Sequence, residues 1–389
     1  MKIGLLLPSA LMYEPLSDGK IFAPKELFLD LADGFVARGH EVRVYSSSDT
    51  KTRATLVAGD DMLALGEPPA MKMRYVGVET KRLLARRDAR WEYELDLTSR
   101  AYADARAGRL EIIHSFLEFS AHYFESASGT TTVYTLHDGL PQKNSLDAWR
   151  LRRFPHDAYV AISENQARNL GGLIDIAGVV YHGLHASRYE PNFQSGDYLL
   201  FIGRYMPEKG LEDALRVGMA TGTLTVLAGS KEYQELAYFR EKIAPLLSHP
   251  LVKQVGFLKG RRKAGLLAGA KALLFPIHWE EPFGLVMIEA MACGTPVIAY
   301  NRGSVSEIVR DGVTGFIVEP EPSPDHPNLP DHPDFVIKKR GIEGLVEAVR
   351  RIGEIDRAAC RRHVEENFTV DKMVEGYERV YQKVLASKG

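Results

Sequence analysis

Two glutamates eight positions apart are the residues with the clearest capacity for chemistry. Glu281 stands beside Pro282 in an expected turn, and Glu289 lies on the helix that we expect after Gly284. The N-terminus of a helix presents unpaired N–H groups and partial positive charge, which suit a phosphate. The two carboxylates could accept hydrogen bonds from a sugar on one side of that phosphate and a ribose on the other. The structural alternative is that Glu281 caps the helix and Glu289 is solvated on its face.

The run after Glu289 reads Ala-Met-Ala-Cys-Gly-Thr-Pro-Val, so we expect the helix to end at Gly294 and a buried strand to follow Pro296. From Glu281 to Val297 the segment resembles the donor-site signature of the family 4 retaining glycosyltransferases, which have the GT-B fold. The resemblance implies that Glu281 orients the sugar of a nucleotide-diphosphate donor and that Glu289 holds its ribose. The donor-binding residues that it implies in this segment are Glu281, Phe283, Gly284, Leu285 and Glu289.

Two cations lie in a loop that contains glycine and proline and follows the expected strand Tyr198–Ile202. The guanidinium of Arg204 can bond two phosphate oxygens at once, and Lys209 supplies a compact charge. The segment resembles the Gly-Arg…Pro-Glu-Lys-Gly motif of the same family, which implies that Gly203, Arg204 and Lys209 hold the donor diphosphate. The alternative is a surface loop with solvated charges.

Three further segments are weaker candidates. Gly19 could let the backbone approach a phosphate, but the family usually has Gly-Gly where this chain has Asp-Gly, so this loop could instead face the acceptor. His137 ends an expected strand and could hydrogen-bond a sugar hydroxyl, unless it is a loop histidine tied to the next aspartate. By resemblance, Phe257 and Leu258 contact the nucleotide base, largely through backbone groups. The residues expected to carry catalysis are Glu281, His137, Arg204 and Lys209.

The chain contains no Asp-x-Asp pair, which a metal-dependent transferase would use to bridge Mg²⁺ to the diphosphate. Arg204, Lys209 and helix N–H groups can neutralise the leaving group instead, so we expect metal-independent transfer, without a metal site or a cofactor. Residues 320–334 are rich in proline, aspartate and histidine. Proline prevents this segment from folding tightly around an ion, so we expect a stiff surface loop.

Composition excludes several classes of protein. Of 389 residues, 45% are hydrophobic and 26% are charged, which is typical of a globular protein, and the net charge of −2 does not favour nucleic acid as a partner. The two cysteines, Cys293 and Cys360, exclude a disulfide framework and a zinc-finger site.

The first apolar run stops at Pro8, as in a buried strand rather than a signal peptide, and no run has the length of a membrane span. We therefore expect a cytoplasmic protein. The basic stretch at 81–90 could contact an anionic membrane, but its acidic neighbours favour a solvated helix face.

Short apolar runs alternate with amphipathic stretches, which predicts βαβ units and parallel sheets. The predicted α/β fold is GT-B: two Rossmann-like domains with parallel sheets that face each other across a cleft. The expected domains are residues 1–188 on the acceptor side, residues 189–368 on the donor side, and a C-terminal helix at 369–389 that packs back on the first domain. The strands expected in the first half are Ile3–Leu7, Val42–Tyr45, Ile112–Ser115, Thr132–Leu136, Ala158–Ile162 and Val179–Tyr181. Those expected in the second half are Tyr198–Ile202, Leu224–Ala228, Val252–Val255, Ala272–Phe275, Val297–Ala299 and Gly315–Val318.

The sequence therefore predicts a retaining, metal-independent glycosyltransferase that moves a hexose from a nucleotide-diphosphate sugar to an acceptor hydroxyl. The acceptor could be a carbohydrate, a small molecule or a lipid-linked sugar. Two alternatives stay open: another GT-B enzyme, such as a sugar-nucleotide epimerase, or a non-catalytic sugar-binding protein.

Overall fold

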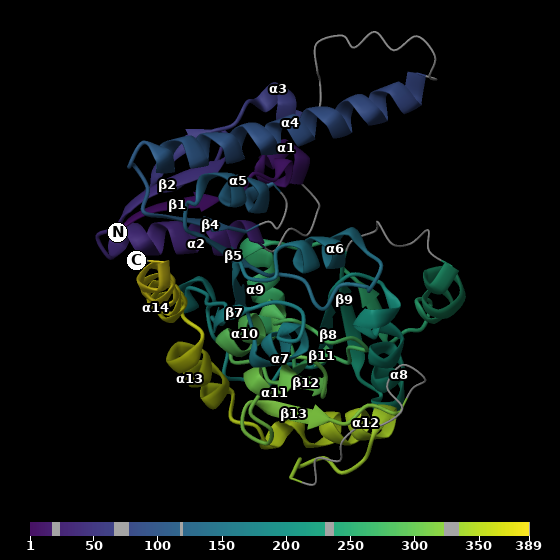
Figure 1. Ribbon diagram of the computed structural model, residues 1–389. Coiled ribbons are helices and arrows are strands. Elements are labelled where there is room, and N and C mark those ends of the chain that lie inside the picture. Colours follow the sequence, from purple (N-terminus) through teal and green to yellow (C-terminus); the bar gives the residue numbers. More distant parts are fainter. Residues whose placement is uncertain (18–23, 66–77, 117–119, 230–236, 323–333, 389) are drawn as a thin grey trace. The chain divides into compact units, whose positions relative to one another are not determined.

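The chain forms two compact units (Figure 1). The computed structural model describes residues 1–17, 24–65, 78–116, 120–229, 237–322 and 334–388. The first unit comprises Met1–Ile162, Gln166–Tyr181 and Val370–Gly389, and the second comprises Ser163–Asn165 and His182–Thr369. The chain therefore passes into the second unit after Tyr181, a few residues before the boundary expected at residue 188. It returns to the first unit at Val370.

A seven-stranded parallel sheet is the centre of the first unit. Its strands lie in the order β3-β2-β1-β4-β5-β6-β7, so the chain reverses its direction of travel across the sheet between β1 and β4. The strands of this unit are β1 (Lys2–Leu6), β2 (Glu41–Ser46), β3 (Thr55–Ala58), β4 (Ile112–Ser115), β5 (Thr132–Thr135), β6 (Ala158–Ala161) and β7 (Ile176–Val179). Its helices are η1 (Ala10–Met12), α1 (Glu14–Ser17), α2 (Pro24–Ala37), α3 (Asp61–Leu65), α4 (Val78–Arg106), α5 (Ala121–Ser128), α6 (Leu146–Arg153), α7 (Glu164–Leu170) and α14 (Val370–Lys388). Every residue of β4 and β5 is buried, as expected for strands with helices on both faces.

Three features of the first unit differ from the prediction. The edge strand β3 was not expected, because it is short and partly exposed. The 29-residue helix α4, prominent in Figure 1, contains the stretch at 81–90 where a helix face was expected, but it continues to Arg106, which was not expected. The last strand was predicted at Val179–Tyr181 but runs over Ile176–Val179, where the chain pairs with β6 through a register shift. Within the stretch at 81–90 the side chains of 81–86 lie outside the described residues, and of the rest Arg87 is exposed, as expected for a solvated helix face.

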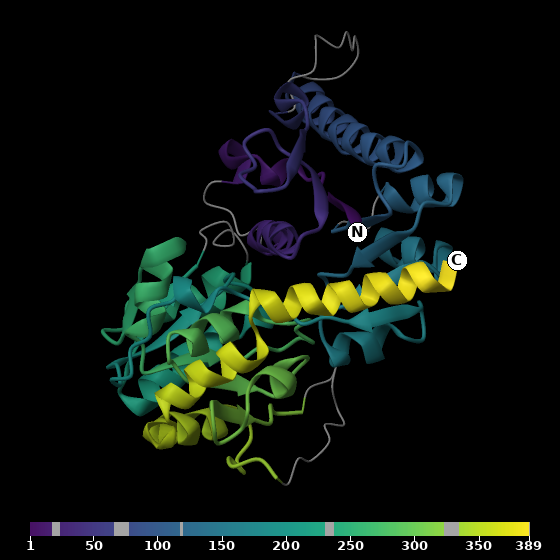
Figure 2. The same cartoon turned by 90° about the vertical axis from the view of Figure 1, so that its left-hand side faces the viewer.

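The C-terminal helix α14 belongs to the first unit and packs beside α2 (Figure 2). The two helices approach so closely that a Cβ atom on Gly34 would lie 2.5 Å from Cγ2 of Val374. At the surface of the same contact, Glu378 accepts hydrogen bonds from Arg38 Nε at 2.9 Å and is 2.7 Å from His40 Nε2. The close approach therefore depends on a glycine, and an ion pair fixes the register of the two helices.

Two tyrosines of α14 also complete a buried hydrogen-bond chain of the first sheet. The hydroxyl of Tyr381 is 2.6 Å from Nδ1 of His114, and that of Tyr377 is 2.9 Å from Oγ1 of Thr135. His114 Nε2 lies 2.7 Å from the same Thr135 oxygen. Burial holds the pKa of His114 well below its usual range, so the histidine stays neutral between these hydroxyls.

The second unit is built on a six-stranded parallel sheet in the order β10-β9-β8-β11-β12-β13. Here the chain reverses its direction across the sheet between β8 and β11. The strands are β8 (Tyr198–Ile202), β9 (Leu224–Ala228), β10 (Val252–Gln254), β11 (Ala272–Phe275), β12 (Val297–Tyr300) and β13 (Gly315–Val318). The helices are η2 (Ala186–Arg188), η3 (Pro207–Lys209), α8 (Leu211–Thr221), η5 (Phe239–Ile243), η6 (Ala244–Leu246), α9 (Gly260–Ala268), α10 (Leu285–Ala292), α11 (Val305–Ile308), α12 (Gly341–Arg351), η7 (Ile352–Glu354) and α13 (Arg357–Asn367).

All six strands of the second unit lie where the sequence predicts them, within one residue at their ends. The central strands are apolar along their length and buried on both faces, so their sequences mark them clearly. The expected loop at 320–334 lies mostly outside the described residues. No helix in the part of the chain that the structure describes is long and apolar enough to cross a membrane.

Candidate active site

Several predicted donor residues lie in the loops where the second sheet reverses its strand order. In open parallel sheets, ligands bind beyond the carboxyl ends of the strands at such a switch point. Here β8 and β11 are neighbours, so the loops that follow them emerge side by side. The first loop carries Lys209 and the second carries Glu281.

A glycine brings the lysine loop against the loop that follows β11. After β8 the chain makes the short helix η3, which ends at Lys209, and Gly210 then turns into α8 with a φ of 71°. A Cβ atom on Gly210 would lie 1.7 Å from the carbonyl oxygen of Pro276. Only glycine allows both this left-handed conformation and this close approach. The ammonium group of Lys209 is thereby placed beside the residues after β11.

Glu281 is the centre of a three-residue contact. Lys209 Nζ donates to Glu281 Oε2 at 2.7 Å, and the indole Nε1 of Trp279 donates to the same oxygen at 2.9 Å. The ammonium group also lies 4.4 Å from the centre of the Trp279 ring, within the range of a cation–π interaction. The Lys209 and Glu281 side chains are only 14% and 13% exposed, so the ion pair is largely shielded from water. The structure therefore pairs two predicted site residues directly and adds a third, Trp279, that was not predicted.

The turn that carries Glu281 is held by the loop after β12. The backbone N–H of Ser304 donates to the carbonyl oxygen of Glu281 at 3.0 Å, and its Oγ donates to the carbonyl oxygen of Phe283 at 2.6 Å. The N–H of Gly303 donates to Glu280 Oε2 at 2.8 Å. These bonds fix the backbone on both sides of Glu281, so the position of its carboxylate does not depend on its own side-chain contacts alone.

Helix α10 begins directly after this turn and carries the second glutamate. Gly284 is its N-cap residue, with a φ of 83°, and Leu285 is its first residue. Glu289 is only 8% exposed. Its carboxylate is 2.6 Å from Nζ of Lys263 on α9 and accepts a hydrogen bond of 3.0 Å from the hydroxyl of Tyr189. Glu289 is therefore an ion-paired residue and not the solvated one of the structural alternative.

Arg204 differs from Lys209 in its contacts with the rest of the chain. It is half-buried, follows Gly203 at the end of β8, and makes no hydrogen bond or ion pair within the described part of the chain. Its guanidinium therefore remains available to an anion, whereas the charge of Lys209 is balanced by Glu281. Phe257 and Leu258 are half-buried and follow β10, at the same edge of the sheet.

Two other predicted site residues are not open side chains in the loops after β8 and β11, and a third is not among the described residues. Phe283 is 2% exposed and packs edge-on against His182, so its ring is part of the core and is not open to a donor. His137, in the first unit, stacks on Phe116, and burial lowers its pKa to about 4, so it is neutral at physiological pH. Gly19 lies outside the described residues.

Sequence analysis missed three residues that hold the glutamates: Trp279, Lys263 and Tyr189. Trp279 lies two positions before Glu281, and one signal could have identified it: the N–H of a buried tryptophan usually has a hydrogen-bond partner, and a carboxylate lies nearby in the sequence. Lys263 lies 26 positions before its partner and Tyr189 lies 100 positions before it, so no local spacing connects them.

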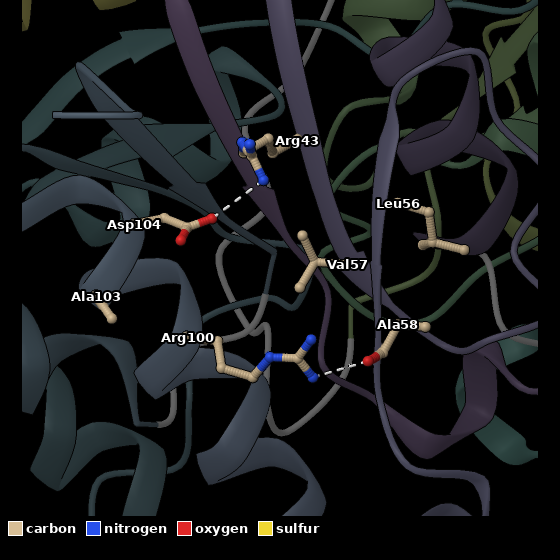
Figure 3. Close-up of a pocket in the computed structure, with 7 residues that line it drawn as sticks. All are labelled: Arg43, Leu56, Val57, Ala58, Arg100, Ala103 and Asp104. Carbon is tan, nitrogen blue, oxygen red and sulfur yellow. Dashed lines mark hydrogen bonds and ion pairs between the residues drawn. The ribbon is translucent and has the colours of Figure 1, made fainter. Parts of the chain in front are cut away.

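A separate pocket of about 470 Å³ in the first unit contains none of these residues (Figure 3). It lies between β3 and α4, and its charged side chains bond within the protein: Arg100 Nη1 donates to the carbonyl oxygen of Ala58 at 2.8 Å, and Arg43 Nη1 lies 3.4 Å from Asp104 Oδ2. Asp104 also accepts a hydrogen bond from the hydroxyl of Tyr45 at 2.6 Å. These contacts hold α4 against the edge of the first sheet, and they leave the charged groups of the pocket paired within the protein. Among the described residues, no group of three or more histidine, cysteine, aspartate or glutamate side chains is arranged to hold a metal ion.

Two family models match the chain over consecutive stretches. The model described as Glycosyltransferase Family 4 matches residues 26–188, and the model described as Glycosyl transferases group 1 matches residues 187–328. The second match includes every predicted donor residue of the second unit.

Known proteins similar to this chain include a glycogen synthase of Mycobacterium tuberculosis, 28% identical over 236 residues, which cover 57% of this chain and 51% of that protein. The D-inositol 3-phosphate glycosyltransferase of Rhodococcus erythropolis is 30% identical over 232 residues, which cover 54% of this chain and 49% of that protein. The chain thus spans about half the length of these curated relatives. Among solved structures, Anabaena HepE in complex with UDP-glucose matches with a TM-score of 0.65 and 18% identity, covering 100% of both chains.

Proposed function

The chain belongs to the group 1 glycosyl transferases, family 4, and has their two-domain α/β fold, GT-B; from this premise we propose that it moves a hexose from a nucleotide-diphosphate sugar to an acceptor hydroxyl, with retention of configuration and without a metal ion. The observation that carries the proposal is the contact of Lys209 and Trp279 with Glu281 at the switch point of the second sheet. It combines a cation suited to phosphate with a carboxylate suited to sugar hydroxyls.

In this mechanism Arg204 and Lys209 bind the diphosphate, which gains negative charge as the sugar departs. Charge stabilisation of this kind acts most strongly at the transition state. Glu281 accepts hydrogen bonds from the sugar, and Glu289 accepts one from the ribose. The leaving phosphate takes the proton of the acceptor hydroxyl on the same face of the sugar, so no residue serves as a covalent nucleophile. His137 is neutral and can hydrogen-bond a sugar hydroxyl without adding charge.

Two points of this proposal concern the donor and the compartment. HepE binds UDP-glucose, which makes uridine nucleotides the first donors to test, with guanosine and adenosine nucleotides beside them. We place the reaction in the cytoplasm, because both cysteines are buried free thiols, as is usual in a reducing compartment.

The test is a screen of UDP-, GDP- and ADP-sugars by thermal shift, followed by product analysis with the donor that stabilises the protein. A bound donor raises the melting temperature by mass action. Transfer to an acceptor, or hydrolysis of the donor with retained configuration, supports the proposal. Isomerisation of the donor would identify an epimerase, and binding without turnover would identify a sugar-binding protein.

The variant Glu281→Gln assigns the chemistry to the site. It preserves the side-chain shape but removes the charge, so we expect transfer to fall by about 10²-fold while the free nucleoside diphosphate, which has no sugar, still binds. The exposed Glu343→Gln in the same unit is the matched control. A large loss of diphosphate affinity in Glu281→Gln would show that Glu281 serves the phosphate or the fold.

A further inference from the structure

Trp279 contacts both charged residues of the site, one through its indole N–H and the other through the face of its ring. Its indole N–H donates to Glu281 Oε2, and the face of its ring lies under the ammonium group of Lys209. It follows β11 by four residues, in the short segment that ends at Glu281. A tryptophan that only filled space would use neither feature.

The ion pair between Lys209 and Glu281 cannot persist unchanged when a donor binds. If Lys209 turns to the diphosphate, its Nζ leaves Glu281 Oε2, to which it now donates at 2.7 Å. Glu281, whose side chain is only 13% exposed, would then lose its cation in a place that water reaches poorly. The indole N–H of Trp279 is the other donor to the same oxygen, so it keeps the carboxylate bonded when the ammonium group has gone.

We propose that Trp279 is a positioning residue: its N–H holds Glu281 in its reactive orientation while Lys209 exchanges between Glu281 and the donor diphosphate. The ring face stabilises the ammonium group in the state without donor, and so sets how readily Lys209 is released. This inference rests on the proposed function, because it assigns Lys209 to the diphosphate and Glu281 to the sugar.

Two substitutions separate the two features. Trp279→Phe keeps an aromatic face for Lys209 and removes the N–H, whereas Trp279→Leu removes both. We expect Trp279→Phe to lower kcat by about 10-fold or more, the effect of one lost hydrogen bond to a charged group, with the Kd of the nucleoside diphosphate within about 2-fold of wild type. We expect Trp279→Leu to lower kcat similarly and also to change that Kd. Trp149→Phe, at an exposed position of the first unit, is the control and should match wild type.

A purely structural role would give a different pattern. It would lower the melting temperature of both variants, and kcat and Kd would change together or not at all. Wild-type kcat in a folded Trp279→Phe variant would overturn the inference.

A second measurement does not depend on turnover. The protein has three tryptophans, and the other two, Trp91 and Trp149, are about half exposed. In the double variant Trp91→Phe/Trp149→Phe, the emission of Trp279 should change on titration with UDP, GDP or ADP, whichever binds, and with pyrophosphate, but not with the free nucleoside. The change should vanish when Lys209→Met is added. Persistence of the change in that variant, or an equal response to the nucleoside, would show that Lys209 does not leave the ring.

The two measurements separate this inference from the proposed function. A diphosphate-dependent emission change without sugar transfer from any donor would refute the proposed transfer and leave the exchange of Lys209 intact. Transfer with unchanged kcat in Trp279→Phe would refute the inference and leave the transferase function intact.

Discussion

The substitution Gly303→Ala tests whether the position of Glu281 depends on the loop after β12. Gly303 has a φ of 57°, and a Cβ atom placed on it would lie 2.2 Å from the carbonyl oxygen of Glu281 and 2.3 Å from its nitrogen. Non-bonded heavy atoms need about 3.5 Å. The backbone of Glu281 must therefore retreat by about 1 Å to admit a single methyl group.

We expect this displacement to lower kcat by about 10²-fold, the scale of loss that follows a 1 Å misplacement of a reacting group. The left-handed backbone alone costs an alanine about 1–2 kcal/mol, so some loss of stability is expected as well. The matched control is Gly222→Ala, because Gly222 has a φ of 64° with no atom within 4 Å of the added Cβ. It carries the same backbone cost without moving Glu281, and it should keep wild-type kcat.

The assay is initial-rate kinetics with the stabilising donor, together with urea unfolding of both variants. Equal kcat in the two folded variants would refute the view that Gly303 positions Glu281. If Gly303→Ala does not fold, Ser304→Ala provides the test, since it removes only the 2.6 Å hydrogen bond to the carbonyl oxygen of Phe283. A fall in kcat of about 10-fold is then expected, and an unchanged kcat would refute the reasoning.

Four further outcomes are expected. Arg204→Ala and Lys209→Ala should each lower the transfer rate by about 10²-fold, and near-wild-type kcat in either folded variant would reject this loop as the diphosphate site. Because Arg204 has no partner in the described chain, Arg204→Ala should change the free energy of unfolding by less than about 0.5 kcal/mol. Transfer should survive EDTA, and loss that Mg²⁺ or Mn²⁺ restores would contradict the metal-free mechanism. Lys263→Met leaves a carboxylate that is 8% exposed without its cation, so urea unfolding should show a loss of about 1–3 kcal/mol, whereas the neighbouring exposed Arg262→Met should change little. Burial lowers the pKa of His137 to about 4 from 6.5, so between these pH values the unfolded chain binds the extra proton and the free energy of unfolding rises with pH. Unfolding measured from pH 4.5 to 7 should show a smaller rise in this free energy for His137→Gln than for wild type, by up to about 3 kcal/mol. Identical slopes for the two proteins would contradict this interpretation.

The second sheet was predictable because its central strands are short, apolar and buried, and because glycine and proline separate the elements. The first unit was harder to predict. Strand β3 is a partly exposed edge strand, so it lacks the continuous apolar run that marks the others. Helix α4 buries Ala89, Tyr93, Leu97, Ala101 and Tyr102, and most of the positions between them are polar or charged. A buried stripe that includes alanine and is interrupted by charged residues gives a weak periodic signal.

In the candidate site, too, some residues were predictable from the sequence and others were not. Glu281, Glu289, Arg204 and Lys209 lie in short motifs, so sequence spacing and family resemblance predict them as site residues. Their partners could not be identified in this way, because contacts such as that of Lys263 with Glu289 are made when helices pack and depend on no local pattern. Sequence alone also could not show that Lys209 bonds directly to Glu281, since the two residues lie 72 positions apart.

The place of α14 in the chain has a consequence for synthesis. This helix belongs to the first unit, yet the ribosome makes it only after the second unit, because the chain returns to the first unit at Val370. Until then, the surface of α2 around Gly34 has no covering helix, and His114 and Thr135 lack the hydroxyl groups of Tyr381 and Tyr377. The second unit can therefore complete its fold during translation while the first waits, and a ribosome that stalls before this helix would release a nascent chain whose first unit is unfinished and open to chaperones and proteases.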